Sequence, residues 1–261
     1  MADLTGKVAV ITGGSKGLGR AIAERLASDG ADGIIAARTQ ADLEAAATAI
    51  ARATGRTIET CAADLGTIEG CERLHEATRS VFDHVDILVN CAGATKAGPF
   101  LDLDDEAWAD GFALKFFGAV RLCRLFWPQL VESRGTVINV SGGLARTPVP
   151  DIMIGGAVNA AFANFSKALA GLGLRDDVNV NVIHPGQTVT ERFETLLATR
   201  AEAAGVSPEK FQEQITERQG VRRLGTPADV AAVAGFLCSP AARHVQGVAI
   251  AVDGGATKGM Y

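Results

Sequence analysis

The sequence lacks paired cysteines and long apolar runs and is poor in tyrosine, and each absence narrows the class of protein. Among 261 residues there is one tyrosine, Tyr261, at the last position. The five cysteines are widely spaced and never form C-x-x-C, which predicts reduced thiols and gives no support for a metal site. Glycines and charged residues interrupt every apolar stretch before the roughly 18 to 20 residues that a membrane span needs.

A surplus of basic residues is also absent. The formal net charge is -5, which argues against a surface that follows nucleic-acid phosphates and favours small molecules as ligands. The amino-terminal residues lack the basic and apolar regions of a secretory signal. We therefore expect a soluble, cytoplasmic protein with neither a nucleic-acid nor a membrane partner.

Short β-branched runs alternate with longer Ala- and Leu-rich stretches along the whole chain. The stretches place apolar residues at i, i+3 and i+4, as helices that cover a sheet must. This alternation predicts an α/β fold with a doubly wound, Rossmann-type parallel sheet between two helical layers. The length suits a single domain over residues 1–261. The seven predicted strands are 8–12, 33–37, 57–63, 86–90, 136–140, 178–183 and 248–252.

One long segment, 188–224, does not lead directly from the sixth predicted strand into the seventh. It contains two helical stretches and leaves the sheet at the carboxyl ends of the strands, where ligands bind in this architecture. We interpret it as a substrate lid, with Phe193, Leu196 and Leu197 as apolar lining. The alternative is a helix that only packs on the periphery.

A glycine-rich turn follows the first predicted strand and opens the first helix. Gly13, Gly17 and Gly19 have the spacing G-x-x-x-G-x-G. Glycines allow a tight turn and let backbone N–H groups approach a pyrophosphate at the positive end of a helix. The turn therefore predicts a dinucleotide site.

The end of the second predicted strand indicates which dinucleotide binds. An acidic residue there would select NAD through the ribose 2′-OH, but this chain has Arg38. Arg38 and Lys16 of the glycine turn could both approach a 2′-phosphate. NADP(H) is the preferred cofactor, and NAD(H) stays possible if both cations are simply exposed.

Further motifs, in the same order along nearly the full length, resemble the short-chain dehydrogenase/reductase family. They are Asp64-Leu65, Asn90-Cys91-Ala92-Gly93, Pro185-Gly186 with Thr188 and Thr190, and Val252-Asp253-Gly254-Gly255. The resemblance implies a cofactor site made of Gly13, Ser15, Lys16, Gly17, Leu18, Gly19, Arg38, Asp64, Leu65, Asn90, Ala92, Gly93, Asn159, Pro185, Gly186, Thr188 and Thr190.

The same resemblance supplies a register for the catalytic positions, and this chain fills them atypically. The family's Ser, Tyr and Lys fall on Gly142, Gly155 and Asn159, while the family's Asn falls on Lys115. In the family the Tyr exchanges a proton with the substrate oxygen. We hypothesise that Lys115 moves that proton or polarises the oxygen, that Asn159 holds the ribose, and that Ser141, one residue from the family's Ser position, belongs to the catalytic set. The alternative is that Lys115 is structural.

Other polar candidates near the strand ends are Thr95, Lys96, Asp151 and His184. For His184 a scaffold role and for Asp151 a solvated turn are the simpler interpretations. The resemblance also implies a homo-oligomer, a tetramer or dimer, in which the tail with Tyr261 could reach a neighbouring subunit.

These observations predict an NAD(P)-dependent oxidoreductase that acts on a largely apolar alcohol or carbonyl compound with a noncanonical catalytic set. One alternative is a dinucleotide-binding pseudoenzyme that serves as a sensor or scaffold, which explains the missing tyrosine. A lyase or dehalogenase-like activity on the same fold is a second alternative.

Overall fold

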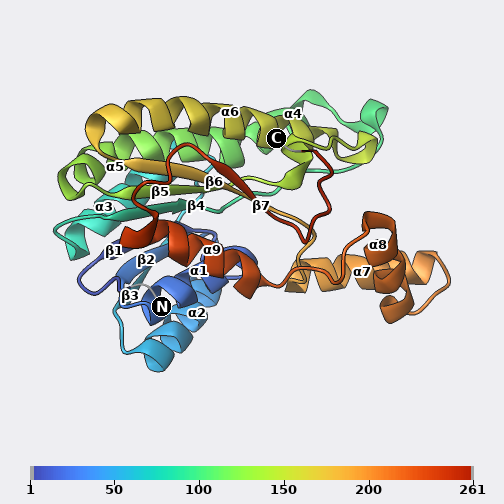
Figure 1. The fold of residues 1–261 in the computed structure, drawn as a ribbon, viewed down its shortest axis with the longest axis horizontal. Coiled ribbons are helices and arrows are strands. Elements are labelled where there is room, and N and C mark those ends of the chain that lie inside the picture. Colours follow the sequence, from blue (N-terminus) through green and yellow to red (C-terminus); the bar gives the residue numbers. More distant parts are fainter. Residues whose placement is uncertain (1–2, 260–261) are drawn as a thin grey trace.

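The computed structural model describes residues 3–259, and these contain seven strands in one parallel sheet (Figure 1). The sheet order is β3-β2-β1-β4-β5-β6-β7. The predicted doubly wound sheet is confirmed. The strands are β1 (Val8–Thr12), β2 (Asp32–Ala37), β3 (Ile58–Ala62), β4 (Ile87–Asn90), β5 (Thr136–Val140), β6 (Asn179–Pro185) and β7 (Ala249–Val252).

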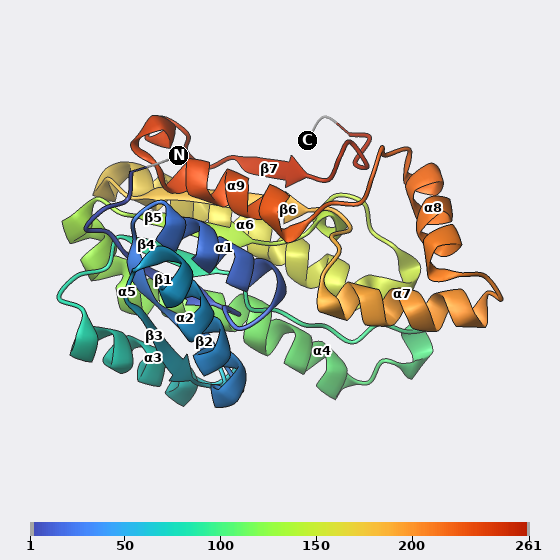
Figure 2. The same cartoon turned by 90° about the horizontal axis from the view of Figure 1, so that it is seen from below.

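Helices cover both faces of the sheet, which gives the three layers seen in Figures 1 and 2. One layer contains α1 (Gly17–Ser28), α2 (Gln40–Thr54) and α9 (Pro227–Cys238). The other contains α3 (Ile68–Val81), α5 (Ala119–Ser133) and α6 (Met153–Asp176), with α4 (Asp105–Phe112) joined to α5 by a π-helical turn, Ala113–Gly118. No helix among the described residues is long and apolar enough to cross a membrane.

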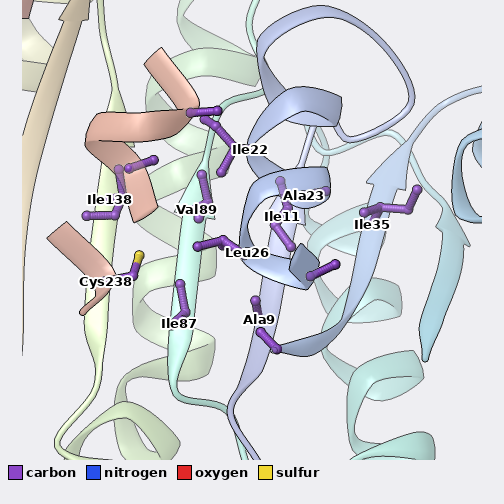
Figure 3. Close-up of a cluster of buried hydrophobic side chains, with 14 of the residues drawn as sticks. Ala9, Ile11, Ile22, Ala23, Leu26, Ile35, Ile87, Val89, Ile138 and Cys238 are labelled. Carbon is purple, nitrogen blue, oxygen red and sulfur yellow. The ribbon is translucent and has the colours of Figure 1, made fainter. Parts of the chain in front are cut away.

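Alternate residues of each strand enter two separate cores because successive side chains of a strand point to opposite faces. Ile11 and Val89 pack with Ile22 and Leu26 of α1 in the first core (Figure 3). Val10 and Leu88 face the second core, with Phe126 of α5. Burial on both faces explains why the strands read as continuous apolar runs.

The strand order determines where a ligand can bind. The chain runs outward from β1 to β3 and then returns to place β4 beside β1, so the direction of winding reverses between β1 and β4. In open α/β sheets ligands bind at such a switch point, beyond the carboxyl ends of the strands. The glycine turn after β1 lies at this point.

The sixth strand is longer than the sequence predicted. It continues through His184 and Pro185, which pair with Ala251 and Val252 of β7. The apolar pattern ends at Ile183, but a proline at the end of a strand can still pair through its carbonyl, which accepts a hydrogen bond.

Two helices, α7 (Glu191–Ala203) and α8 (Pro208–Gln219), form the predicted excursion and project from the layered body (Figures 1 and 2). The two ends of the segment meet in a parallel bridge between Thr188 and Gly225. Leu197, Ile215 and Leu224 form its own apolar cluster, with Phe193 packed against them. Because its ends are joined and its apolar residues pack on one another, residues 188–224 form a distinct segment, which is called the lid segment below.

Candidate functional site

A cavity of about 530 Å³ lies over the carboxyl ends of β1 and β4. Most residues predicted for the cofactor line it, and they come from segments far apart in the sequence. Its lining includes Gly13, Ser15, Lys16, Gly17, Leu18, Gly19, Arg38, Leu65, Ala92, Gly93, Gly186, Thr188 and Thr190. The structure therefore brings the dispersed motifs together at one cavity.

The glycine turn fits a pyrophosphate. The Cβ of a residue at position 19 would lie 2.3 Å from the carbonyl oxygen of Gly13, so only glycine allows α1 to begin this close to the turn. The residue before α1, Lys16, makes no side-chain cap, and the first turn holds no acidic residue. The N–H groups at the positive end of α1 are thus available to an anion.

Thr12 and Gly13 join the glycine turn to the segment after β4. The Thr12 hydroxyl accepts hydrogen bonds from the N–H groups of Cys91 and Ala92, both at 2.9 Å. Gly13 has φ +70°, and a Cβ there would lie 3.2 Å from the Ala92 backbone. The contact brings together two segments that both line the cavity.

The two cations predicted to select a 2′-phosphate differ in the structure. The Lys16 ammonium forms an ion pair with Asp42 at 2.8 Å, which raises the pKa of Lys16 and neutralises its charge. Arg38 lines the cavity, is exposed, and has no ion pair within residues 3–259. Arg38 is therefore the better placed of the two for a phosphate.

Four predicted cofactor residues do not line this cavity. The Asn90 side chain is buried and donates to Asn139 at 2.9 Å, so it supports the strands below the cavity. The Asp64 carboxylate accepts the N–H of Gly66 at 3.0 Å. Pro185 and Asn159 line a second cavity instead. The family motif located these residues, but it did not indicate which way their side chains point.

Sequence reasoning also missed several residues that line the cofactor cavity. Most of them lie next to motif residues in the sequence, and two are at the start of the lid segment. The signal that could have found several of them is their position at the end of a strand. They are Ala37, Ala63, Cys91, Ala94, Leu114, Glu191 and Arg192.

The second, larger cavity has a volume of about 1140 Å³ and lies between the β5–α6 connection, the lid and the segment after β7. Gly142 and Asn159, two of the four predicted catalytic positions, line it. Phe193, Leu196 and Leu197 do not, so their predicted role as cavity lining is wrong. Phe193 and Leu197 belong to the apolar cluster inside the lid segment, and Phe211 is an apolar residue of this segment that does line the cavity.

Gly142 and Asn159 share one space. A Cβ at position 142 would lie 2.7 Å from the Asn159 amide nitrogen, so the amide occupies the place of the absent side chain. Asn159 is only 5% exposed, and its Oδ1 atom is buried without a hydrogen-bond partner. An unpaired buried acceptor is costly, which is typical of a group that meets a ligand.

The hydroxyl of Ser141 is directed away from both cavities. It donates to the backbone oxygen of Asn159 at 3.0 Å, and the residue is 6% exposed. Ser141 thus anchors α6 to the end of β5. The prediction that its hydroxyl belongs to the catalytic set is not supported by this geometry.

Lys115 lies in the π-helical turn, a distortion that is frequent at functional sites. Its stem passes over Gly93, where a Cβ would lie 2.8 Å from the lysine Cδ. The ammonium donates to the backbone oxygen of Ser141 at 2.8 Å. Burial lowers the pKa of Lys115 to about 8, although the nearby Cys91 opposes this. The turn therefore places a lysine with a near-neutral pKa at the ends of β4 and β5.

Among the remaining candidates, His184 and Thr95 contact other parts of the protein, whereas Asp151 lines a cavity. His184 is buried, its Nδ1 accepts the N–H of Gly142 at 3.3 Å, and burial lowers its pKa to about 4. A Cβ at Gly155 would lie 3.1 Å from the Thr95 hydroxyl, so Thr95 occupies part of the vacant space there. Asp151 lines the larger cavity. Tyr261 lies outside the described residues.

Known proteins resemble the chain over nearly its full length. The family described as Enoyl-(Acyl carrier protein) reductase matches residues 13–257. An uncharacterized oxidoreductase of Mycobacterium tuberculosis is 38% identical over 98% of this chain and 94% of its own. The uncharacterized oxidoreductase YvaG of Bacillus subtilis is 30% identical over 99% of both chains.

Solved structures have the same fold. The L-sorbose reductase of Gluconobacter frateurii, complexed with NADPH and L-sorbose, superimposes with a TM-score of 0.95 and 33% identity, over 99% of this chain and 100% of that one. A short-chain dehydrogenase of Burkholderia cenocepacia in complex with NADP has a TM-score of 0.86 and 28% identity, over 97% and 99%.

Replacing Gly13 with alanine should weaken dinucleotide binding at least tenfold. The Cβ would force the turn away from Ala92 and strain the positive φ. Gly55 has the same φ of +70°, with nothing within 4 Å of a Cβ, and is the matched control. Fluorescence titration with NADPH measures both variants. Equal losses in Gly13→Ala and Gly55→Ala would contradict a specific role for the close approach.

The Lys115→Met substitution should stabilise the protein at pH 7. A pKa lowered from 10.5 to about 8 means that burial of the lysine charge destabilises the folded protein by about 3 kcal/mol. Methionine removes this cost but loses a hydrogen bond that contributes about 1 kcal/mol. Between pH 8 and 10.5 the unfolded chain binds more protons, so wild-type stability rises with pH and the advantage of the variant shrinks.

Urea unfolding at pH 7 and pH 9.5 tests this difference. Lys167 also donates to a backbone oxygen, that of Gly247 at 2.7 Å, but is exposed, so Lys167→Met is the control. A variant advantage that is identical at both pH values would contradict a buried charge at Lys115.

Proposed function

Because the chain belongs to the short-chain dehydrogenase/reductase family of NAD(P)-dependent oxidoreductases, we propose that it transfers hydride between NADP(H) and an alcohol or ketone, with Lys115 in place of a catalytic tyrosine. The observation that carries this proposal is the Lys115 ammonium at the ends of β4 and β5, with a pKa of about 8. A group with a pKa near the working pH is suited to donate and accept a proton.

Two observations support NADP(H) as the cofactor. Arg38 lines the smaller cavity after the end of β2, together with Ala37 and Ala63, and has no acidic partner in the described chain. Guanidinium groups bind phosphates through paired hydrogen bonds. Two structural neighbours were solved with NADPH or NADP. NAD(H) would lack the phosphate that Arg38 is placed to meet.

Hydride transfer to a ketone needs a proton for the developing alkoxide, and the nicotinamide supplies only the hydride. Lys115 gives up one ammonium proton and becomes neutral, and solvent restores the proton; alcohol oxidation reverses these steps. Lys115 does not line either cavity, but its hydrogen-bond partner Ser141 directly precedes Gly142, which does. One bridging water suffices for such a transfer.

Asn159 is the second residue of the proposed set. Its buried Oδ1 lacks a donor, and a ribose hydroxyl of the dinucleotide would supply one. The absence of a side chain at Gly142 leaves the space in which this amide lies. We therefore assign Asn159 to the ribose, whereas the Ser141 hydroxyl serves the backbone of α6.

A dinucleotide-binding pseudoenzyme is the second candidate function. The structure favours it in one respect, because Lys115 lies behind the cavity walls and Gly142 and Gly155 contribute no side chain. Tight NADPH binding without turnover on a broad panel of ketones and alcohols would support this alternative.

We further propose that the protein acts in the cytoplasm as a homo-oligomer, a dimer or tetramer, and that the segment 188–224 is its substrate lid. Family membership supports the first statement, and the contact of the lid with the larger cavity supports the second.

Activity of Lys115→Met should fall by about 10²- to 10⁴-fold in kcat, the usual contribution of a general acid or base. In the wild type, ketone reduction should be level below about pH 8 and decline above it, since the charged form is the donor. Alcohol oxidation should show the opposite limb. Steady-state rates from pH 6 to 10 test this, with Lys167→Met as control, and an unchanged pH profile in Lys115→Met would remove Lys115 from the mechanism.

The Arg38→Gln substitution should raise the KM for NADPH at least tenfold and leave the KM for NADH nearly unchanged, because only the former carries the 2′-phosphate. Arg52→Gln, at the far end of α2, is the control. Parallel changes for both dinucleotides would show that Arg38 does not discriminate between them.

A further inference from the structure

The charged residues of the lid segment that line the larger cavity are all cationic. Residues 188–224 contain six carboxylates and six cationic side chains. None of the six glutamates lines the larger cavity, whereas two of the arginines, Arg200 and Arg218, do. In a protein with a net charge of -5, a lid wall whose charged side chains are all cationic is a local reversal of sign.

The two arginines come from different helices and reach the same cavity. Arg200 is near the end of α7, and Arg218 is in the last turn of α8. A third cation, Lys258, follows β7, and its Nζ atom lies 3.3 Å from where a Cβ of Gly220 would be. All three cationic residues line the same cavity.

No carboxylate among residues 3–259 forms an ion pair with Arg200 or Arg218. Two acidic residues do line the cavity. The Asp253 carboxylate accepts the N–H groups of Gly255 at 2.9 Å and Thr257 at 2.8 Å. Asp151 belongs to the separate connection between β5 and α6. The charge on the lid wall is thus left for a ligand.

We propose that the substrate carries a carboxylate, which Arg200 and Arg218 bind when the lid covers it. The planar guanidinium presents paired N–H donors that match the two oxygens of a carboxylate. The remainder of the cavity offers apolar contacts from Leu144, Ile152 and Phe211, so the substrate is an apolar carbonyl or alcohol compound with an anionic end. The identity of the reacting group rests on the proposed oxidoreductase function, but the binding of the carboxylate does not.

Binding of a matched, unreactive pair of probes tests the subsite independently of turnover. With NADP⁺ present, 4-phenylbutyrate should bind at least tenfold more tightly than its uncharged amide in calorimetric titration. Arg200→Gln and Arg218→Gln should each remove most of that preference. Arg222→Gln, in the same segment but outside the cavity lining, should retain it. Equal binding of acid and amide to the wild type would overturn the proposal.

Steady-state kinetics distinguish carboxylate binding from the oxidoreductase activity. The ratio of kcat/KM for a keto acid over its methyl ester should fall about tenfold in Arg200→Gln and Arg218→Gln and should keep its wild-type value in Arg222→Gln. A rise in the KM for NADPH instead would assign the arginines to the cofactor phosphates and overturn the proposal. If carboxylate-selective binding is seen but no carbonyl compound is reduced, the oxidoreductase function fails while the carboxylate site stands.

Discussion

The close contact between the backbone after β1 and the backbone after β4 is the constraint on which the site depends. The Thr12 hydroxyl accepts hydrogen bonds from two backbone N–H groups of the segment after β4. Gly13, which has no side chain, lets the two backbone segments approach closely. The contact lies where the winding of the sheet reverses. It holds the start of α1 and the segment from Cys91 to Ala94 on either side of one cavity, and Lys115 then packs on Gly93.

Away from this contact, the structure keeps polar groups in arrangements that lower stability. Lys115 is charged in a place where burial lowers its pKa, and Asn159 keeps an unpaired buried oxygen. Packing alone would favour apolar side chains at both positions. Groups that are unfavourable in the folded protein and lie beside a cavity are characteristic of ligand sites, because a ligand can supply the missing partner.

The lid segment, residues 188–224, is packed separately from the main cores. Its ends are tied together at Thr188 and Gly225, and its apolar residues mostly contact one another. Of its charged residues, Glu191 and Arg192 line the smaller cavity, and Arg200 and Arg218 line the larger one. The same segment thus contributes cations to the larger cavity.

The sequence by itself determined the fold, the strand positions within a few residues, and the glycine turn, because periodicity and glycine spacing are local properties of the chain. The resemblance to the family supplied the register that led to Lys115 and Asn159. Only the tertiary structure decided which side chains reach a cavity. Asn90 occupies a motif position and Ser141 lies next to one, but both side chains form hydrogen bonds inside the protein, and the Lys16 ammonium is paired with Asp42. Conversely, Arg200 and Arg218 carry no local signal, since a charge pattern on a helix does not show which face another part of the chain will cover.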